Sequence, residues 1–387
     1  MNILILTFYY PPDLSAGSFR VDALVKQLST KISPEDTVSI ITTMPNRYHS
    51  YQTDQVQEVE QCGNIHIHRI RIPQHKSGFR DQVRSFTVFF YNALKIARKE
   101  QYDAVFATSS RLFTAFLGML IARWKKIPLY LDIRDIFTET IESVSQGRMN
   151  RLSLLFIYGI ESLTVNYAKK INLVSEGFAP YFRTRYPYMP ISFFPNGIDA
   201  EFADYNFTAT QKKEKITVVY AGNIGKSQGL ENILPPLAEK YPAVHFIIIG
   251  DGSAKVQLIH HLKGARNVIL MDPMPRTELL TMYRESDYLF LHLNDYAAFK
   301  RVLPSKIFEY GATGKPVLAG VSGYAKEFIE KNLPDSIVFA PNDPDDFSKK
   351  FNPQKIPDHI SREEFLSAYS RSSIMDTLTQ DVLETLA

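Results

Sequence analysis

The chain has 387 residues, of which 45% are hydrophobic and 22% charged, and its formal net charge is +3. This length is long for a single hydrophobic core, so two domains of ordinary size are expected. The single cysteine, Cys62, excludes an internal disulfide, and the longest uncharged apolar stretch, the 11 residues from Leu112 to Ala122, is too short to span a bilayer, which needs about 20 residues.

Charge is distributed unevenly along the chain. Residues 1–200 hold 23 lysines and arginines against 17 acids, whereas residues 201–387 hold 21 against 24. The first segment, Met1–Leu6, is typical of a β-strand rather than of a charged leader with a cleavage site. We therefore expect a cytoplasmic protein whose first half is the more basic.

Short apolar runs alternate with helical patterns along the first half. The expected strands are Asn2–Phe8, Thr37–Thr42, Ile65–Ile72, Ala104–Thr108, Leu129–Ile133, Lys170–Val174 and Ile191–Phe194, and the expected helices include Gly17–Leu28 and Gln82–Lys99. This alternation predicts a parallel α/β sheet.

The second half repeats the alternation. The expected strands are Ile216–Ala221, His245–Gly250, Val268–Leu270, Tyr288–His292 and Pro316–Ala319, separated by helices at Leu230–Lys240, Ala254–Leu262 and Thr277–Glu285. Two Rossmann-like domains are therefore predicted.

A turn signal at 195–199 and a polar stretch after it indicate the join between these domains. The proline-rich stretch 341–357 is expected to be a loop, and Glu363–Ala387 one or two amphipathic helices that cross back to the first domain. The predicted N-terminal domain is 1–203 with the C-terminal helix 366–387, and the predicted C-terminal domain is 204–365.

Ligands of open α/β sheets bind at the carboxyl ends of the strands. After the first strand, small residues around Gly17 open a helix and allow a phosphate to approach the backbone. One cation, Arg134, and two acids, Asp135 and Glu139, follow the expected strand Leu129–Ile133. They form either a catalytic group or a salt-bridged helix cap.

The second half has two glycine-rich strand ends. The turn from Gly222 to Gly229 contains Asn223, Lys226 and Gln228, and suits the oxygens of a pyrophosphate. A further turn at Gly250 is either part of this site or an ordinary tight turn, and Met274 can pack on a flat base. We expect the second domain to bind a nucleotide.

The most informative stretch is 301–317, which begins with Arg301. Pro304 and Ser305 favour a helix start whose N–H groups attract diphosphate, and Lys306 adds a positive charge. Glu309, one turn later, can accept hydrogen bonds from both hydroxyls of a ribose. The alternative is an ordinary amphipathic helix with an i, i+3 salt bridge.

These motifs resemble those of the family 4 retaining glycosyltransferases, both in their residues and in their order, and the resemblance covers nearly the whole chain. The opening Thr7–Pro12 and the Gly222–Gly229 turn are most like the bacterial branch that builds O-antigen, capsule or colanic-acid units. The resemblance implies the GT-B fold, two Rossmann-like domains facing each other across a cleft. It also implies that Glu309 binds the donor ribose, that Lys306 and the turn hold the diphosphate, and that Gly17 faces the donor phosphates.

Several positions depart from the family pattern. Arg301 stands where many members have the first glutamate of a pair, Asn223 and Gln228 replace the usual arginine and lysine, and Arg134 replaces a histidine. We expect Lys226 and Lys306, with Arg301, to supply the positive charge, so that no metal or other cofactor is needed. Asp135 is the candidate to orient the acceptor hydroxyl or to take its proton, assisted by Arg134 or Glu139.

The resemblance implies a peripheral enzyme of the inner membrane face that moves a sugar, by default from a UDP-sugar, to a lipid-diphosphate-linked saccharide for lipopolysaccharide or capsule. The basic first half and the aromatic segment 79–99 are compatible with an anionic membrane surface, although a core helix with a basic edge gives the same pattern. Nucleic acid is not expected as a partner, because no dense basic run supports it.

The alternatives are a nucleotide-sugar epimerase or hydrolase on the same fold, an inactive nucleotide-sugar-binding relative, and a binding protein of the periplasmic type. The missing export signal disfavours the last of these. Nicotinamide chemistry is disfavoured because neither glycine-rich loop has the dinucleotide fingerprint.

Overall fold

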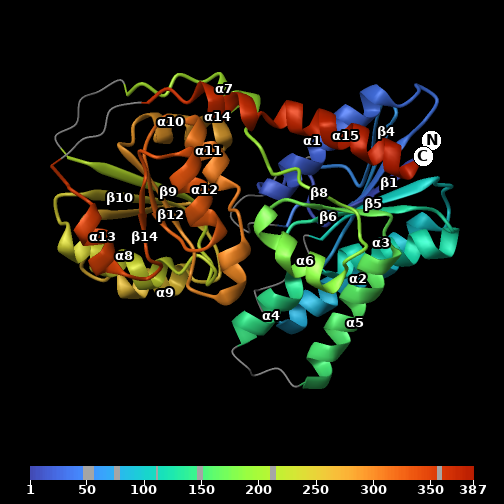
Figure 1. The fold of residues 1–387 in the computed structure, drawn as a ribbon, viewed down its shortest axis with the longest axis horizontal. Helices are drawn as coiled ribbons and strands as arrows, with labels where there is room; N and C mark the ends of the chain where they lie inside the picture. The colour runs from blue at the N-terminus through green and yellow to red at the C-terminus, as the bar shows by residue number, and fades with distance from the viewer. Residues whose placement is uncertain (47–55, 74–78, 110–111, 146–150, 210–214, 355–359) are drawn as a thin grey trace. The chain divides into compact units, whose positions relative to one another are not determined.

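The computed structural model describes residues 1–46, 56–73, 79–109, 112–145, 151–209, 215–354 and 360–387 (Figure 1). These form two compact units, one comprising Met1–Asn196 with Ser372–Ala387 and the other Gly197–Arg371. Each unit is an α/β body built on a sheet of mainly parallel strands, which confirms the predicted fold class.

The first unit contains an eight-stranded sheet in the order β3-β4-β2-β1-β5-β6-β7-β8. Its strands are β1 (Ile3–Leu6), β2 (Val38–Thr43), β3 (Val59–Cys62), β4 (Ile65–Ile70), β5 (Ala104–Thr108), β6 (Leu129–Ile133), β7 (Lys170–Leu173) and β8 (Ile191–Ser192). All neighbours are parallel except the edge pair β3 and β4. The exposed strand β3 has no continuous apolar run, which is why the sequence pattern does not reveal it.

Helices cover both faces of this sheet. They are α1 (Ala16–Lys31), α2 (Phe79–Ala97), α3 (Leu112–Lys125), α4 (Phe137–Ser145), α5 (Arg151–Tyr167), α6 (Ala179–Arg185) and α15 (Arg371–Leu386). Side chains alternate along β1, so Ile3 and Ile5 pack in a cluster with α1, while Leu6 faces Gly118 of α3 on the other side.

The C-terminal helix α15 packs on the first unit, as predicted. Met375, Leu378, Val382 and Leu386 join the buried cluster that α1 forms with the sheet. Asp381 fixes the helix to the strands, because it accepts a hydrogen bond of 2.6 Å from the hydroxyl of Tyr130 and pairs with Lys170.

The second unit contains a six-stranded, fully parallel sheet in the order β11-β10-β9-β12-β13-β14. Its strands are β9 (Thr217–Asn223), β10 (His245–Asp251), β11 (Val268–Met271), β12 (Tyr288–His292), β13 (Val317–Gly320) and β14 (Ile337–Phe339). Its helices are α7 (Ala200–Ala203), α8 (Leu230–Lys240), α9 (Lys255–His261), α10 (Arg276–Arg284), α11 (Lys306–Ala312), α12 (Tyr324–Asn332), α13 (Pro344–Lys350) and α14 (Glu363–Ala368).

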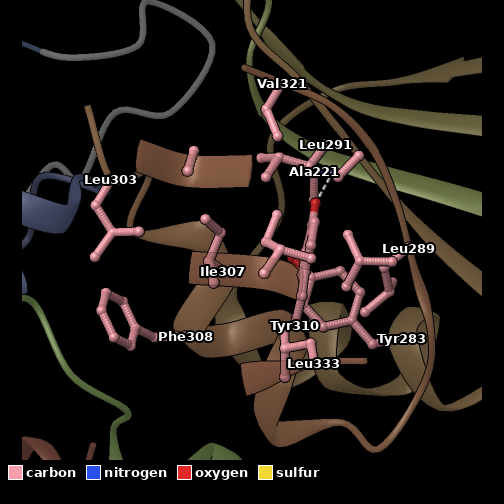
Figure 2. Close-up of a cluster of buried hydrophobic side chains, with 14 of the residues drawn as sticks. Ala221, Tyr283, Leu289, Leu291, Leu303, Ile307, Phe308, Tyr310, Val321 and Leu333 are labelled. Carbon is pink, nitrogen blue, oxygen red and sulfur yellow. Dashed lines mark hydrogen bonds between the residues drawn. The ribbon is translucent and has the colours of Figure 1, made fainter. Parts of the chain in front are cut away.

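Two buried clusters fill the two faces of this sheet. One contains Val219 and Leu289 with side chains of α10, α11 and α12, and the other contains Val218 and Phe246 with side chains of α8 and α13. Figure 2 shows part of the first cluster, where the hydroxyl of Tyr310 accepts a hydrogen bond of 3.2 Å from the backbone N–H of Ala221. That bond ties α11 to β9, the two elements that carry the site described below.

The boundaries between the units differ from the predicted ones by about six residues. The first boundary follows Asn196 rather than residue 203, because Phe202 and Phe207 pack in the core of the second unit. The second follows Arg371 rather than residue 365, because Phe365 packs in that core and Ile198 forms a β-bridge with Ser370.

One local prediction needs correction, and one pair of open alternatives can be compared with the structure. The stretch 341–357 is not only a loop, because Asp343 caps the helix α13 by accepting hydrogen bonds from the N–H groups of Asp345 and Asp346; its residues 355–357 lie outside the described residues. For the segment 79–99 the sequence leaves a membrane-facing helix and a core helix open, and Phe86 and Phe89 of α2 pack inward on Phe8 as in a core helix. Val83 and Tyr91 are exposed on the outer face of α2.

Within the described residues, every helix is too short or too polar to cross a bilayer.

Candidate functional site

The candidate site lies in the second unit, where the carboxyl ends of β9 and β10 meet the start of α11. Gly222 is the last but one residue of β9, and a Cβ added there would lie 3.8 Å from Cε of Lys306. The Gly250 turn lies against the same strand end, since a Cβ at Gly250 would come within 1.9 Å of the carbonyl oxygen of Gly222. Only glycine permits that approach.

The turn after β9 is held in shape by its own side chains. Asn223 donates a hydrogen bond of 2.9 Å to Oε1 of Gln228, and the hydroxyl of Tyr220 donates one of 2.6 Å to the carbonyl oxygen of Asn223. Gly229 ends the turn with a φ of 59° and leads directly into α8. A glycine turn before a helix N-terminus is a common site for phosphate oxygens.

A buried histidine supports this turn from β12. The N–H of Asn342 donates to Nε2 of His292 at 3.0 Å, so Nδ1 carries the proton and donates to the carbonyl oxygen of Gln228 at 2.5 Å. Burial lowers the pKa of His292 to about 4, so the ring is neutral at physiological pH. The sequence gives no signal for this role, because His292 appears only as the end of an apolar strand.

Lys306 and Glu309 form an ion pair on α11, with Nζ 2.7 Å from Oε2. The carboxylate of Glu309 is 10% exposed, and Arg276 lies 3.8 Å from its other oxygen. Burial alone would raise the pKa of Glu309, but the charges of Lys306 and Arg276 outweigh it and hold the pKa below its ordinary value. The group is therefore an ionised, largely buried acceptor of hydrogen bonds.

Arg276 extends this pair into a network that the sequence reading missed. It contacts Asp199 at 2.5 Å and Glu201 at 2.6 Å, and Arg371 contacts Asp199 at 2.5 Å. Asp199 belongs to the turn that the sequence analysis used as a domain boundary. Arg276 begins the helix α10, and no local motif marks it as a binding residue, so only the three-dimensional structure shows its part in the site.

Four further residues predicted to bind the donor lie on the same unit, whereas Gly17 belongs to the first unit. Lys226 is exposed on the turn, and Met274 is half-buried against the core two residues before Arg276. Ser305 directly precedes α11, and Arg301 ends the short helix Ala297–Arg301; both are half-buried. The structure thus brings Gly222, Asn223, Gln228, Gly250, Lys306 and Glu309 together, and places the other four on the flanking segments.

The predicted catalytic residues lie at the end of β6 in the first unit. The N–H of Arg134 donates to Oγ of Ser109 at 2.9 Å, and its guanidinium donates to Oδ1 of Asn196 at 3.2 Å. Asp135 is exposed, and Glu139 is half-buried in the first turn of α4.

A buried ion pair beneath these residues was not predicted. Arg20 of α1 makes two hydrogen bonds of 2.9 Å to Asp132, which also accepts one of 2.7 Å from Asn172. Burial would raise the pKa of Asp132, but Arg20 and Arg134 hold it below its ordinary value. This network fixes the strand end that precedes Arg134. Gly17, which was predicted to face the donor phosphates, is buried in the first turn of α1.

Residues 202–354 match the family model described as "Glycosyl transferases group 1". This range contains the glycine turns, Lys306 and Glu309. Residues 202–354 are therefore a group 1 glycosyltransferase domain.

The chain is similar to known proteins in sequence and in structure. It is 21% identical over 350 residues, 84% of each chain, to a putative colanic acid biosynthesis glycosyl transferase, WcaI, of Escherichia coli K12. Its fold is similar to that of sucrose-phosphate synthase from Thermosynechococcus elongatus, with a TM-score of 0.78, 12% identity, and 99% and 98% of the two chains covered. It is also similar to Anabaena HepE in complex with UDP and glucose, with a TM-score of 0.67, 14% identity and both chains covered completely.

These similarities agree with the two parallel-sheet bodies and confirm the predicted GT-B fold.

Proposed function

We propose that the protein is a retaining glycosyltransferase that moves a sugar from a UDP-sugar to a lipid-diphosphate-linked saccharide in the synthesis of a bacterial surface polysaccharide. The observation that carries the donor assignment is the ionised Lys306–Glu309 pair beside the Gly222–Gly229 turn. UDP is the proposed nucleotide because HepE, of the same fold, was solved with UDP and glucose.

The donor residues divide into two groups by chemistry. Glu309 is ionised and accepts hydrogen bonds from the two ribose hydroxyls. Lys306, Lys226 and the N–H groups that lead into α8 contact the diphosphate, and Met274 packs on the uracil. Arg301 and Ser305 complete the site beside α11.

The reaction breaks the bond between the anomeric carbon and the diphosphate oxygen. The electron pair moves to that oxygen, and the lysines and backbone N–H groups stabilise the charge on the departing UDP without a bound metal. The acceptor hydroxyl attacks the anomeric carbon from the same face and loses its proton to Asp135, with Arg134 and Glu139 assisting. The new glycosidic bond forms on the face of the sugar from which UDP departs, so the anomeric configuration is retained.

A lipid-linked acceptor is proposed because the WcaI relative carries a colanic acid biosynthesis name and because lipid carriers hold such saccharides at a membrane. The protein would then act on the inner face of the cytoplasmic membrane, where nucleotide sugars are made. O-antigen and capsule repeat units are acceptors of the same class.

The test is a transfer assay on the purified protein with UDP-glucose, UDP-galactose and their N-acetyl forms, and a lipid-diphosphate-linked saccharide. A disaccharide product whose new bond has the donor's anomeric configuration, formed in the presence of EDTA, is the expected result. Donor-only reactions serve as the control: conversion of the UDP-sugar without acceptor would instead indicate an epimerase or hydrolase.

A further inference from the structure

Helix α5 of the first unit exposes large apolar side chains along one face. Leu152, Leu155, Phe156 and Leu163 are 78%, 66%, 65% and 59% exposed. Their spacing of three, one and seven residues places them on one stripe of the helix. Gly159 lies within the stripe, and no atom lies within 4 Å of a Cβ added there.

The opposite face of α5 buries polar groups. Glu161 accepts hydrogen bonds of 2.7 Å from Thr138, 2.5 Å from Tyr181 and 3.3 Å from Tyr186. Turning the helix to bury its leucines would break all three of these hydrogen bonds. The outward orientation of the stripe is therefore fixed by the interior of the unit.

Two of the helices that pack with α5 carry cations and no acids, and a third, α4, carries acids. α3 and α6 pack with α5, the latter through Arg185 over the ring of Tyr158 at 4.7 Å. The three helices hold one acid, the buried Glu161, and five cations: Arg123, Lys125, Arg151, Arg183 and Arg185. α4 adds Glu139 and Glu142, and Glu142 accepts a hydrogen bond of 2.9 Å from the hydroxyl of Tyr158.

We infer that the apolar stripe of α5 docks into the interfacial region of an anionic lipid bilayer. An apolar helix face with cations at its margin is the pattern by which a helix lies in the plane of a membrane surface. A second copy of the chain meeting the stripe through the same face would bring its own Arg151 and Arg185, and like charges oppose such a contact.

The inference extends the proposed function by naming the surface that meets the membrane, which is α5 rather than the aromatic helix α2. The inference depends on the proposed function only because that function explains why the protein would bind a membrane. The docking itself needs neither a sugar donor nor an acceptor, so its test can fail or succeed independently of transfer.

The test is co-sedimentation of the full chain with vesicles of phosphatidylcholine and phosphatidylglycerol in equal parts. The double variant Leu155→Ser, Phe156→Ser should bind about tenfold or more weakly, because two large side chains no longer enter the bilayer. The matched control is Val256→Ser on α9, a position that is 80% exposed in the other unit, and it should bind as the wild type does.

Two further readings complete the test. Arg151→Gln should weaken binding to the anionic vesicles and leave any binding to pure phosphatidylcholine unchanged. UDP affinity and the thermal midpoint of the double variant should equal those of the wild type, since the changed side chains are exposed; if that variant does not fold, Leu152→Ser alone replaces it.

Wild-type protein that ignores the vesicles, or a double variant that binds as well as the wild type, would overturn the inference. A wild-type dimer that the double variant converts to a monomer, with no vesicle binding by either, would also overturn it and assign the stripe to a second copy.

Discussion

Nζ of Lys306 lies 2.7 Å from Oε2 of Glu309, one helical turn along α11, beside the last residues of β9. This pair keeps the carboxylate ionised in a largely buried position, where an unpaired charge would be costly. A ligand with adjacent hydroxyls and a diphosphate satisfies both members of the pair at once.

Replacing Lys306 by methionine should weaken UDP binding by about tenfold to a hundredfold, the range expected for one lost charge-assisted hydrogen bond. The same change should raise the pKa of Glu309, because its main positive neighbour is lost. Isothermal titration with UDP measures the first effect. Lys300→Met, a nearby exposed lysine, is the control and should bind UDP normally.

Replacing Arg276 by glutamine should lower the free energy of unfolding by about 2–3 kcal/mol, because Asp199, Glu201 and Glu309 lose their shared cation. Urea unfolding measures the loss. Lys326→Gln removes an exposed pair with Glu330 and should cost less than about 1 kcal/mol. Equal losses in the two variants would remove the argument for a structural network around Arg276.

Acid should destabilise the second unit through His292. Its pKa is lowered to about 4 in the fold, whereas the unfolded chain takes up the proton near the ordinary value of about 6.5. Above pH 6.5 the titration of His292 does not affect the free energy of unfolding. As the pH falls from 6.5 towards 4, the unfolded chain binds a proton that the folded chain does not, and the free energy of unfolding decreases by about 3 kcal/mol in total. In urea unfolding at a series of pH values, His292→Gln should lack this component, while the exposed control His260→Gln should keep it.

Gly250→Ala should destabilise the second unit by several times the cost of an ordinary surface change, because the new methyl group would overlap the carbonyl oxygen of Gly222. Gly159→Ala is the matched control, since its methyl group meets open space in the helix α5. That control should stabilise the protein by about 0.5–1 kcal/mol. Thermal unfolding of both variants tests whether the two changes in stability have opposite signs.

The sequence predicts those parts of the fold that depend on periodicity. Apolar runs such as Tyr288–His292 become buried parallel strands, and the tail becomes α14 and α15. It does not reveal β3, whose residues are all exposed, or α5, whose polarity is reversed because Glu161 is buried and Leu155 is not. A pattern method assumes that apolar residues face inward, and it fails where they do not.

The candidate site was predictable where a motif lies within one short segment. Local spacing is enough to identify Lys306, Glu309 and the Gly222–Gly229 turn as candidate binding residues. Arg276 and Arg371 reach the site from segments distant in the sequence, so their role depends on the tertiary fold. The same holds for Arg20, whose partner Asp132 is more than a hundred residues away in the chain.

The most direct measurement is the UDP affinity of the wild type, Glu309→Gln and Asp135→Asn by isothermal titration. We predict that the wild type binds UDP, that Glu309→Gln binds it about tenfold or more weakly because the ribose loses its charged acceptor, and that Asp135→Asn binds it normally but no longer transfers sugar. Wild-type binding that Glu309→Gln leaves unchanged, or no binding of UDP at all, would contradict the assignment of this site to the donor.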